Sequence, residues 1–178
     1  MLDTKRIIEA QKNTTTYLRE GMLKKETNNT AKNMFLKNSD LSLETAQRLL
    51  VLEKEGFKSY LWVVVTSYYS MYYIANAVLL TLGYKVGDKV SHKVTSDALI
   101  TYVRDKLHKE LIEGYEDSQE DALELVATRT DSLIKSFDFE RGKRSKFQYD
   151  TSEEIQRKKA ITSLTRAKEF VFELKKLL

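Results

Sequence analysis

The chain has 178 residues, a formal net charge of +4 and a hydrophobic fraction of 42%, with six glycines and neither proline nor cysteine. This length suits one domain with a substantial core, and the absence of cysteine excludes disulfides, thiolate metal sites and cysteine nucleophiles. The net charge is too small to indicate nucleic-acid binding by itself, because only clustered charge builds a strong field. Scarce helix breakers favour long helices, so we expect an all-α protein, an up-and-down bundle of five to six helices in a single domain, 1–178.

The first expected helix falls within residues 3–25, where a thin apolar stripe indicates a helix that depends on docking to the rest of the chain. We treat residues 1–27 as an N-terminal extension of a bundle core that covers 28–178. Residues 28–30 (Asn-Asn-Thr) supply N-cap chemistry for a second helix, which is expected to stop at Gly56.

The longest expected helix, placed at about residues 57–83, comes from the uncharged run at 59–84, SYLWVVVTSYYSMYYIANAVLLTLGY. A run of this length could span a bilayer, which needs about 20 apolar residues. However, four tyrosines lie in its middle (Tyr68, Tyr69, Tyr72 and Tyr73), whereas membrane helices carry tyrosine at their ends. We therefore favour a buried central helix over a membrane span.

Three further helices are expected: from Ser91 to about His108, from Ala122 to Phe137 or Phe139, and from Thr151 or Ser152 to the C-terminus. The acidic stretch 113–121, around Gly114, is expected to be a turn-rich connection. The N-terminus lacks the apolar run of a signal peptide, so we expect a cytoplasmic protein.

A basic connection precedes the last helix. Aromatic residues lie on both sides of this connection. Its four cations fall within six residues: Arg141, Lys143, Arg144 and Lys146. Cations hold phosphates and aromatic faces stack on unpaired bases, so the segment is a candidate RNA contact; a solvated loop is the simpler interpretation.

The tyrosine pairs recur at a spacing of four, which places Tyr68 with Tyr72 and Tyr69 with Tyr73 along one side of the central helix. Core packing is the preferred explanation for at least three of them; one or two could instead face a groove, with Tyr69 and Tyr72 as the candidates to contact an RNA or nucleotide. His92, at a helix start, is the best general acid or base in the chain, although a surface role is the simpler reading. The two histidines stand 16 residues apart, so neither a metal site nor a cofactor is expected.

Three stretches resemble the HEPN superfamily of small helical bundles. They are LETAQRLL at 43–50; YYSMYYIANAVLL at 68–80, followed by Gly83 and Ser91-His92; and RSKFQYD at 144–150, followed by AKEFV at 167–171. The second stretch is the most specific of the three. The resemblance covers about residues 30–178.

Ribonucleolytic members of that superfamily carry an arginine, four to six residues and then a histidine, and two such motifs meet across a homodimer. The resemblance thus implies a homodimer, a nucleotidyltransferase-type antitoxin as protein partner, and Arg144 as the cation for the phosphorane. Tyr149 stands where the histidine belongs. A tyrosine titrates near pH 10 and is a poor base at neutral pH, so the chain resembles a branch that reads Arg-x4-Tyr-Asp.

Three hypotheses follow, in order of preference. The first is a HEPN-like module that binds RNA or nucleotide and a protein partner, as the toxin-like half of a toxin–antitoxin pair with a degenerate motif. The second is a metal-independent endoribonuclease that uses Arg144 with Tyr149 or His92. The third is a purely structural dimerisation protein.

Overall fold

The computed structural model describes residues 2–88, 90–139 and 153–178, with side chains described for 2–88, 90–126 and 153–178. Six α-helices lie in these ranges: α1 (Thr4–Glu20), α2 (Asn29–Val51), α3 (Tyr60–Thr81), α4 (Ser91–Tyr102), α5 (Lys109–Phe139) and α6 (Glu153–Lys175). Short 3-10 turns, η1 (Leu52–Glu55) and η2 (Arg104–Lys106), follow α2 and α4. The expected all-α helical bundle is confirmed.

Helix α3 forms the centre of the core. Its buried face includes Val63, Met71, Ile74 and Leu79, which are all 0% exposed. By length and composition α3 could cross a membrane, but 78% of its most apolar window is buried by the other helices. The uncharged run therefore serves as the core helix of the bundle.

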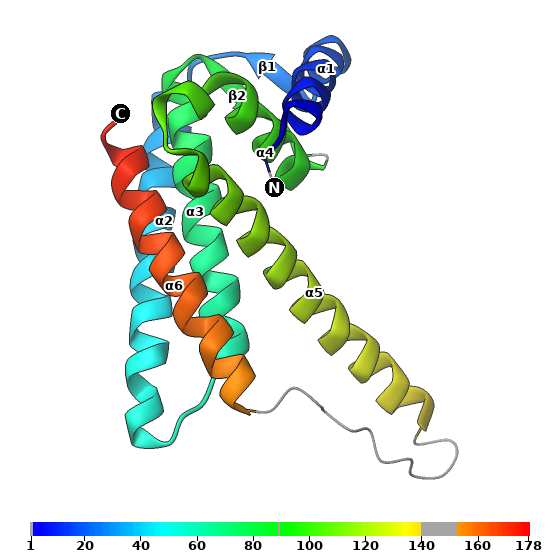
Figure 1. Cartoon of the computed structure of the whole chain (residues 1–178), viewed down its shortest axis with the longest axis vertical. Helices are drawn as coiled ribbons and strands as arrows, with labels where there is room; N and C mark the ends of the chain where they lie inside the picture. Colours follow the sequence, from blue (N-terminus) through cyan, green and yellow to red (C-terminus); the bar gives the residue numbers. More distant parts are fainter. Residues whose placement is uncertain (1, 89, 140–152) are drawn as a thin grey trace.

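The helices around α3 differ in how closely they follow it. In Figure 1, α2 and α6 run alongside α3 for most of its length, whereas α5 starts beside α3 and diverges from it toward the far end of the bundle. Helices α1 and α4 lie together at the end of the bundle where α3 finishes. This arrangement brings the start of α4 next to the middle of α3.

A two-stranded sheet, which the sequence did not predict, joins α1 to the end of α3. Strand β1 (Leu23–Lys25) pairs antiparallel with β2 (Tyr84–Val86), with Leu23 opposite Val86. Two glycines in the left-handed conformation end the preceding helices: Gly21 (φ 75°) and Gly83 (φ 83°). The first and central helices are therefore shorter at their C-terminal ends than predicted, because glycine adopts this conformation without the usual steric cost.

The predicted boundary between the fourth and fifth helices is wrong. Helix α4 ends at Tyr102, before the predicted His108, and α5 already begins at Lys109, 13 residues ahead of Ala122. The acidic stretch thought to be a turn is helical because it carries a buried face: Ile112, Tyr115, Ser118 and Ala122. Gly114 is also buried in this helix, with its Cα facing the side chain of Arg166 on α6.

The helix starts were predicted with mixed success. Asn28 caps α2, and its side-chain Oδ1 accepts a hydrogen bond from the backbone N–H of Ala31 at 2.8 Å, as expected. Gly56, in the left-handed conformation, ends the helical segment that continues α2, also as expected. Ser91 is the first residue of α4 and not its cap; Val90 occupies the cap position with φ 45°, a strained conformation for a β-branched residue.

Candidate functional site

The clearest polar contact between α3 and α4 joins Tyr68 to His92. The Tyr68 hydroxyl lies 2.7 Å from His92 Nδ1. Tyr68 is buried, with 1% of its surface exposed, whereas His92 is half-buried. The two residues are 24 positions apart, and the turn through β2 returns the chain so that His92, in the first turn of α4, meets the middle of α3.

Two more tyrosines of α3 pack around the imidazole. The ring centroid of His92 lies 4.5 Å from that of Tyr72 and 5.8 Å from that of Tyr69, the latter edge-on. Tyr73 lies beside Tyr69 and stacks on Phe35 of α2. We call Tyr69, Tyr72, Tyr73 and His92 the aromatic surface.

All four members of the aromatic surface are half-buried. Tyr68 is fully buried in the core, and Tyr69 and Tyr72 are half-buried and packed against it, so three of the four tyrosines contribute to core packing, as expected. Tyr69 and Tyr73 stay partly exposed because their positions lie on the side of α3 that also carries Trp62, which is 57% exposed. The aromatic surface thus presents partly exposed aromatic side chains, a residue type that can stack on planar ligands.

A neighbouring polar pair fixes α4 against α3. The Asn76 amide on α3 donates to the Thr95 hydroxyl at 3.2 Å, and both side chains are buried. Thr95 stands three residues after His92, almost one helical turn along α4. This bond limits sliding of α4 along α3 and so holds the imidazole in register with the tyrosines.

Burial governs the titration of this cluster. The pKa of His92 is lower than usual, because burial disfavours the imidazolium. Burial raises the pKa of Tyr68 and of Tyr115, a buried residue of α5 whose ring centroid lies 5.8 Å from that of Tyr68. The site is therefore neutral at physiological pH, with both phenols protonated.

The proton between Tyr68 and His92 decides what the imidazole can do. When the Tyr68 hydroxyl donates to Nδ1, the neutral ring carries its own proton on Nε2, which can donate to a phosphate oxygen. In the other tautomer, Nδ1 donates to the Tyr68 oxygen and Nε2 is a base. A protonated phenol beside a neutral imidazole favours the first arrangement.

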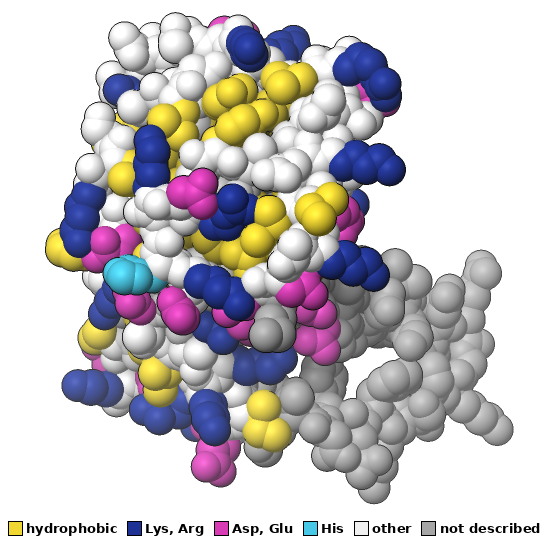
Figure 2. Space-filling view, turned by 45° about the horizontal axis from the view of Figure 1, so that its top comes forward, with side chains coloured by type: hydrophobic (Ala, Val, Ile, Leu, Met, Phe, Trp, Pro, Cys, Tyr) yellow, Lys and Arg dark blue, Asp and Glu magenta, His cyan; other side chains and the backbone are white. Residues whose placement is uncertain are grey.

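The predicted basic residues lie outside the described residues. They are Arg141, Lys143, Arg144 and Lys146, and Tyr149 lies outside the described residues as well, so the predicted meeting of His92 with Arg144 and Tyr149 stays a prediction. The structure does bring together three other predicted residues: His92, Tyr69 and Tyr72. On the face shown in Figure 2, basic and acidic side chains are interspersed around small apolar patches. The described ranges contain no group of three or more histidines or acidic residues that could hold a metal ion.

A second polar cluster, which the sequence reasoning missed, connects α1 to α4 and α5. Arg6 forms ion pairs with Asp97 on α4 (Nη1–Oδ1, 2.6 Å) and with Glu116 on α5 (Nη2–Oε1, 2.8 Å). Asp97 is 0% exposed, and its other oxygen accepts hydrogen bonds from Asn13 (3.0 Å) and Tyr17 (2.9 Å) of α1. We call Arg6, Asp97 and Glu116 the Arg6 clasp.

A sequence signal for this cluster existed. Asp97 is the only charged residue of the otherwise uncharged run 94–103. A carboxylate in such a run is buried and needs a cationic partner. The partner itself could not be read from the sequence, because Arg6 is 91 residues away in a helix whose docking site was unknown.

Comparison of the chain with protein-family models, with curated proteins and with solved structures finds no match.

Proposed function

We propose that this chain is a HEPN-like cytoplasmic module that binds single-stranded RNA or a nucleotide and acts as the toxin-like half of a toxin–antitoxin pair. A homodimer and a nucleotidyltransferase-type antitoxin are the partners that the resemblance implies. The observation that carries the proposal is the aromatic surface, where the partly exposed side chains of Tyr69 and Tyr72 lie next to His92. Aromatic faces of this kind stack on unpaired bases with little sequence preference.

Two further features support binding of a nucleic acid. A donor on His92 Nε2 suits a phosphate oxygen, and the neutral imidazole costs less to desolvate than a fixed charge. The basic connection adds four cations within six residues, from Arg141 to Lys146, a composition suited to phosphate contact.

The test is a titration of fluorescently labelled single-stranded RNA at several salt concentrations. The proposal predicts binding that weakens with salt, and a smaller salt dependence for the double variant Arg141→Ala with Arg144→Ala. The slope of log K against log[salt] should fall by about 1.4, because each phosphate contact to a single strand contributes about 0.7. An unchanged slope contradicts the role of the basic connection, and absent binding by the wild-type protein leaves the structural dimerisation hypothesis.

The toxin role has its own test. Induced expression should slow growth, and expression of the Arg144→Ala variant should not. Equal growth of the two cultures contradicts the toxin proposal while leaving RNA binding to the titration.

An endoribonuclease is the second candidate function, and the lowered pKa of His92 is the observation that favours it. An imidazole that is neutral at pH 7 can accept a proton when the tautomer leaves Nε2 free. Cleavage of labelled RNA in the presence of a chelator, lost in both His92→Ala and Arg144→Ala, is the expected result for this function. Intact RNA with the wild-type protein excludes it.

A further inference from the structure

The Arg6 clasp and the aromatic surface share helix α4, and the clasp also reaches α5 next to Tyr115, which packs on Tyr68. On α4, Ser96 and Asp97 follow His92 by four and five residues; on α5, Glu116 directly follows Tyr115. Arg6 holds both helices at once: its Nε and Nη2 donate to Glu116 Oε1 at 3.0 and 2.8 Å, while Nη1 pairs with Asp97.

These contacts close a ring through four helices. Arg6 of α1 binds Glu116 of α5, the adjacent Tyr115 packs on Tyr68 of α3, and the Tyr68 hydroxyl bonds His92 of α4. Asp97, also on α4, pairs with Arg6 and so completes the ring. Since each link spans two helices, a change in the spacing of α4 and α5 must alter the contacts at Tyr68.

Apolar packing does not fill the space between α4 and α5 on the side of Arg6. A surface cavity of about 510 Å³, open to solvent, lies there, and its lining includes Arg6, Ser96, Glu116 and Glu120. The polar bridge across this gap is made by the Arg6 guanidinium together with the 3.0 Å hydrogen bond from the Ser96 hydroxyl to Glu116. The Arg6 clasp is thus placed to set the distance between α4 and α5 on this side, where apolar side chains do not set it.

We infer that Arg6 is a positioning residue for His92: by bridging Asp97 and Glu116 it fixes α4 against α5 and keeps the imidazole seated on Tyr68 and Tyr72. Helix α1 thereby acts as part of the site, although no described residue of α1 belongs to the aromatic surface. The inference rests on the proposed function for its biological meaning, but its geometry can be tested without RNA.

The test measures the pKa of His92 by NMR in the free protein, with His108→Gln as the background that leaves a single histidine. The described groups that face the ring are the phenols of Tyr68, Tyr69 and Tyr72. The decisive variant is Glu116→Gln, which weakens the link to α5 and retains the Arg6–Asp97 pair. Loosening admits water to His92 and raises its pKa toward the ordinary value of about 6.5.

Direct electrostatics gives the opposite sign. Removing the negative charge of Glu116 without any movement can only lower the pKa of His92, because a nearby anion favours the imidazolium. Glu120→Gln is the matched control: it removes the same charge from the same helix and cavity wall, but Glu120 makes no ion pair with Arg6. A raised pKa in Glu116→Gln with no rise in Glu120→Gln supports the inference.

A fall or no change of the His92 pKa in Glu116→Gln overturns it. Arg6→Ala should shift the pKa in the same direction as Glu116→Gln, with Arg19→Ala on the same helix as its unshifted control. RNA affinity, measured separately, distinguishes the proposed function from the positioning role of Arg6. A shifted His92 pKa in a protein that binds no RNA refutes the proposed function and leaves the positioning role of Arg6 intact.

Discussion

The Tyr68 hydroxyl lies 2.7 Å from Nδ1 of His92 and joins the core helix to the first turn of α4. This bond places a neutral, half-buried imidazole next to two partly exposed tyrosines. It also predicts how the imidazole titrates.

Replacing Tyr68 with phenylalanine should raise the pKa of His92. A hydroxyl that donates to Nδ1 stabilises the neutral ring, and its loss removes that stabilisation while the ring stays buried. The expected rise is about half a unit to one unit, since a hydrogen bond contributes ~0.5–1.5 kcal/mol and one unit equals 1.36 kcal/mol. NMR titration of the Cε1 proton measures it. A fall in pKa would instead mean that the Tyr68 oxygen, by accepting from Nδ1–H, stabilises the imidazolium more than the neutral ring.

Stability should fall through His92 as the pH drops below about 6.5. The pKa of His92 is lower in the folded protein than the ordinary value of 6.5, so the unfolded chain binds the proton more readily. Its contribution is complete above the unfolded pKa of 6.5 and is lost as the pH falls toward the folded pKa. Urea denaturation at a series of pH values measures this loss.

Three carboxylates also contribute to the pH dependence of stability, but at lower pH than His92. The lowered pKa values of Glu26, Glu53 and Glu113 arise mainly from hydrogen bonds to Lys85, to Arg157 and to the backbone N–H of Leu2, respectively. Their contribution is lost only below about pH 5. His92→Gln should therefore flatten the profile just below pH 6.5 and leave the loss of stability at acid pH in place; an unflattened profile contradicts the assignment.

Arg6→Ala should destabilise the protein by about 3–5 kcal/mol, because it leaves the Asp97 carboxylate buried without its cationic partner. Arg19→Ala, on the same helix, should cost under about 0.5 kcal/mol, since Arg19 is 77% exposed and its nearest carboxylate oxygen lies 3.8 Å away. Urea unfolding measures both. Equal effects would mean that the buried pair does not hold α1 in place.

Two glycine substitutions should change stability in opposite directions. Gly83→Ala should cost about 1–2 kcal/mol, because Gly83 has φ 83° although space for a methyl group is available. Gly114→Ala should stabilise by about 0.5–1 kcal/mol, since alanine favours a helix interior and its Cβ would lie 3.7 Å from Arg166 Cδ, an ordinary contact. Thermal unfolding measures the pair, and destabilisation by Gly114→Ala would contradict the helical start of α5.

The sequence predicted the elements with strong periodicity or unusual composition. The uncharged run gave α3 and its place in the core, and Asn28 marked the start of α2. The start of α5 was missed because charged residues on its exposed face hide a stripe through Tyr115, and Gly114 reads as a turn signal. The β1–β2 pair was missed because strands of three residues leave no measurable alternation.

The sequence predicted which residues belong to the site, but not how they are arranged. His92 and the tyrosines were singled out by residue type, and packing alone decides that Tyr68 is buried while Tyr69 and Tyr72 stay partly exposed. The Arg6 clasp depends on a contact between residues 91 positions apart, which no local pattern encodes. Long-range pairing of this kind follows from the fold and is not visible in single-sequence periodicity.

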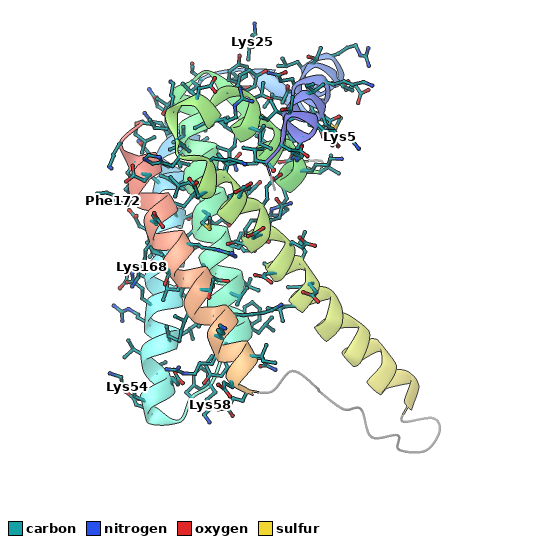
Figure 3. The ribbon with its side chains drawn as sticks, viewed as in Figure 1. Lys5, Lys25, Lys54, Lys58, Lys168 and Phe172 are labelled. Carbon is teal, nitrogen blue, oxygen red and sulfur yellow. The ribbon has the colours of Figure 1, made fainter. Side chains whose placement is uncertain are left out.

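The affinity of Tyr72→Ala for labelled single-stranded RNA, measured by fluorescence anisotropy, tests the role of the aromatic surface most directly. The matched control is Phe172→Ala, which removes an aromatic ring that is 63% exposed on the outer side of α6 (Figure 3). If the aromatic surface stacks on a base, Tyr72→Ala should bind about 5- to 150-fold more weakly, because one stacked base contributes ~1–3 kcal/mol. Phe172→Ala should bind like the wild-type protein. Equal affinity of Tyr72→Ala and wild type, with both folded, would show that the aromatic surface does not stack on a base.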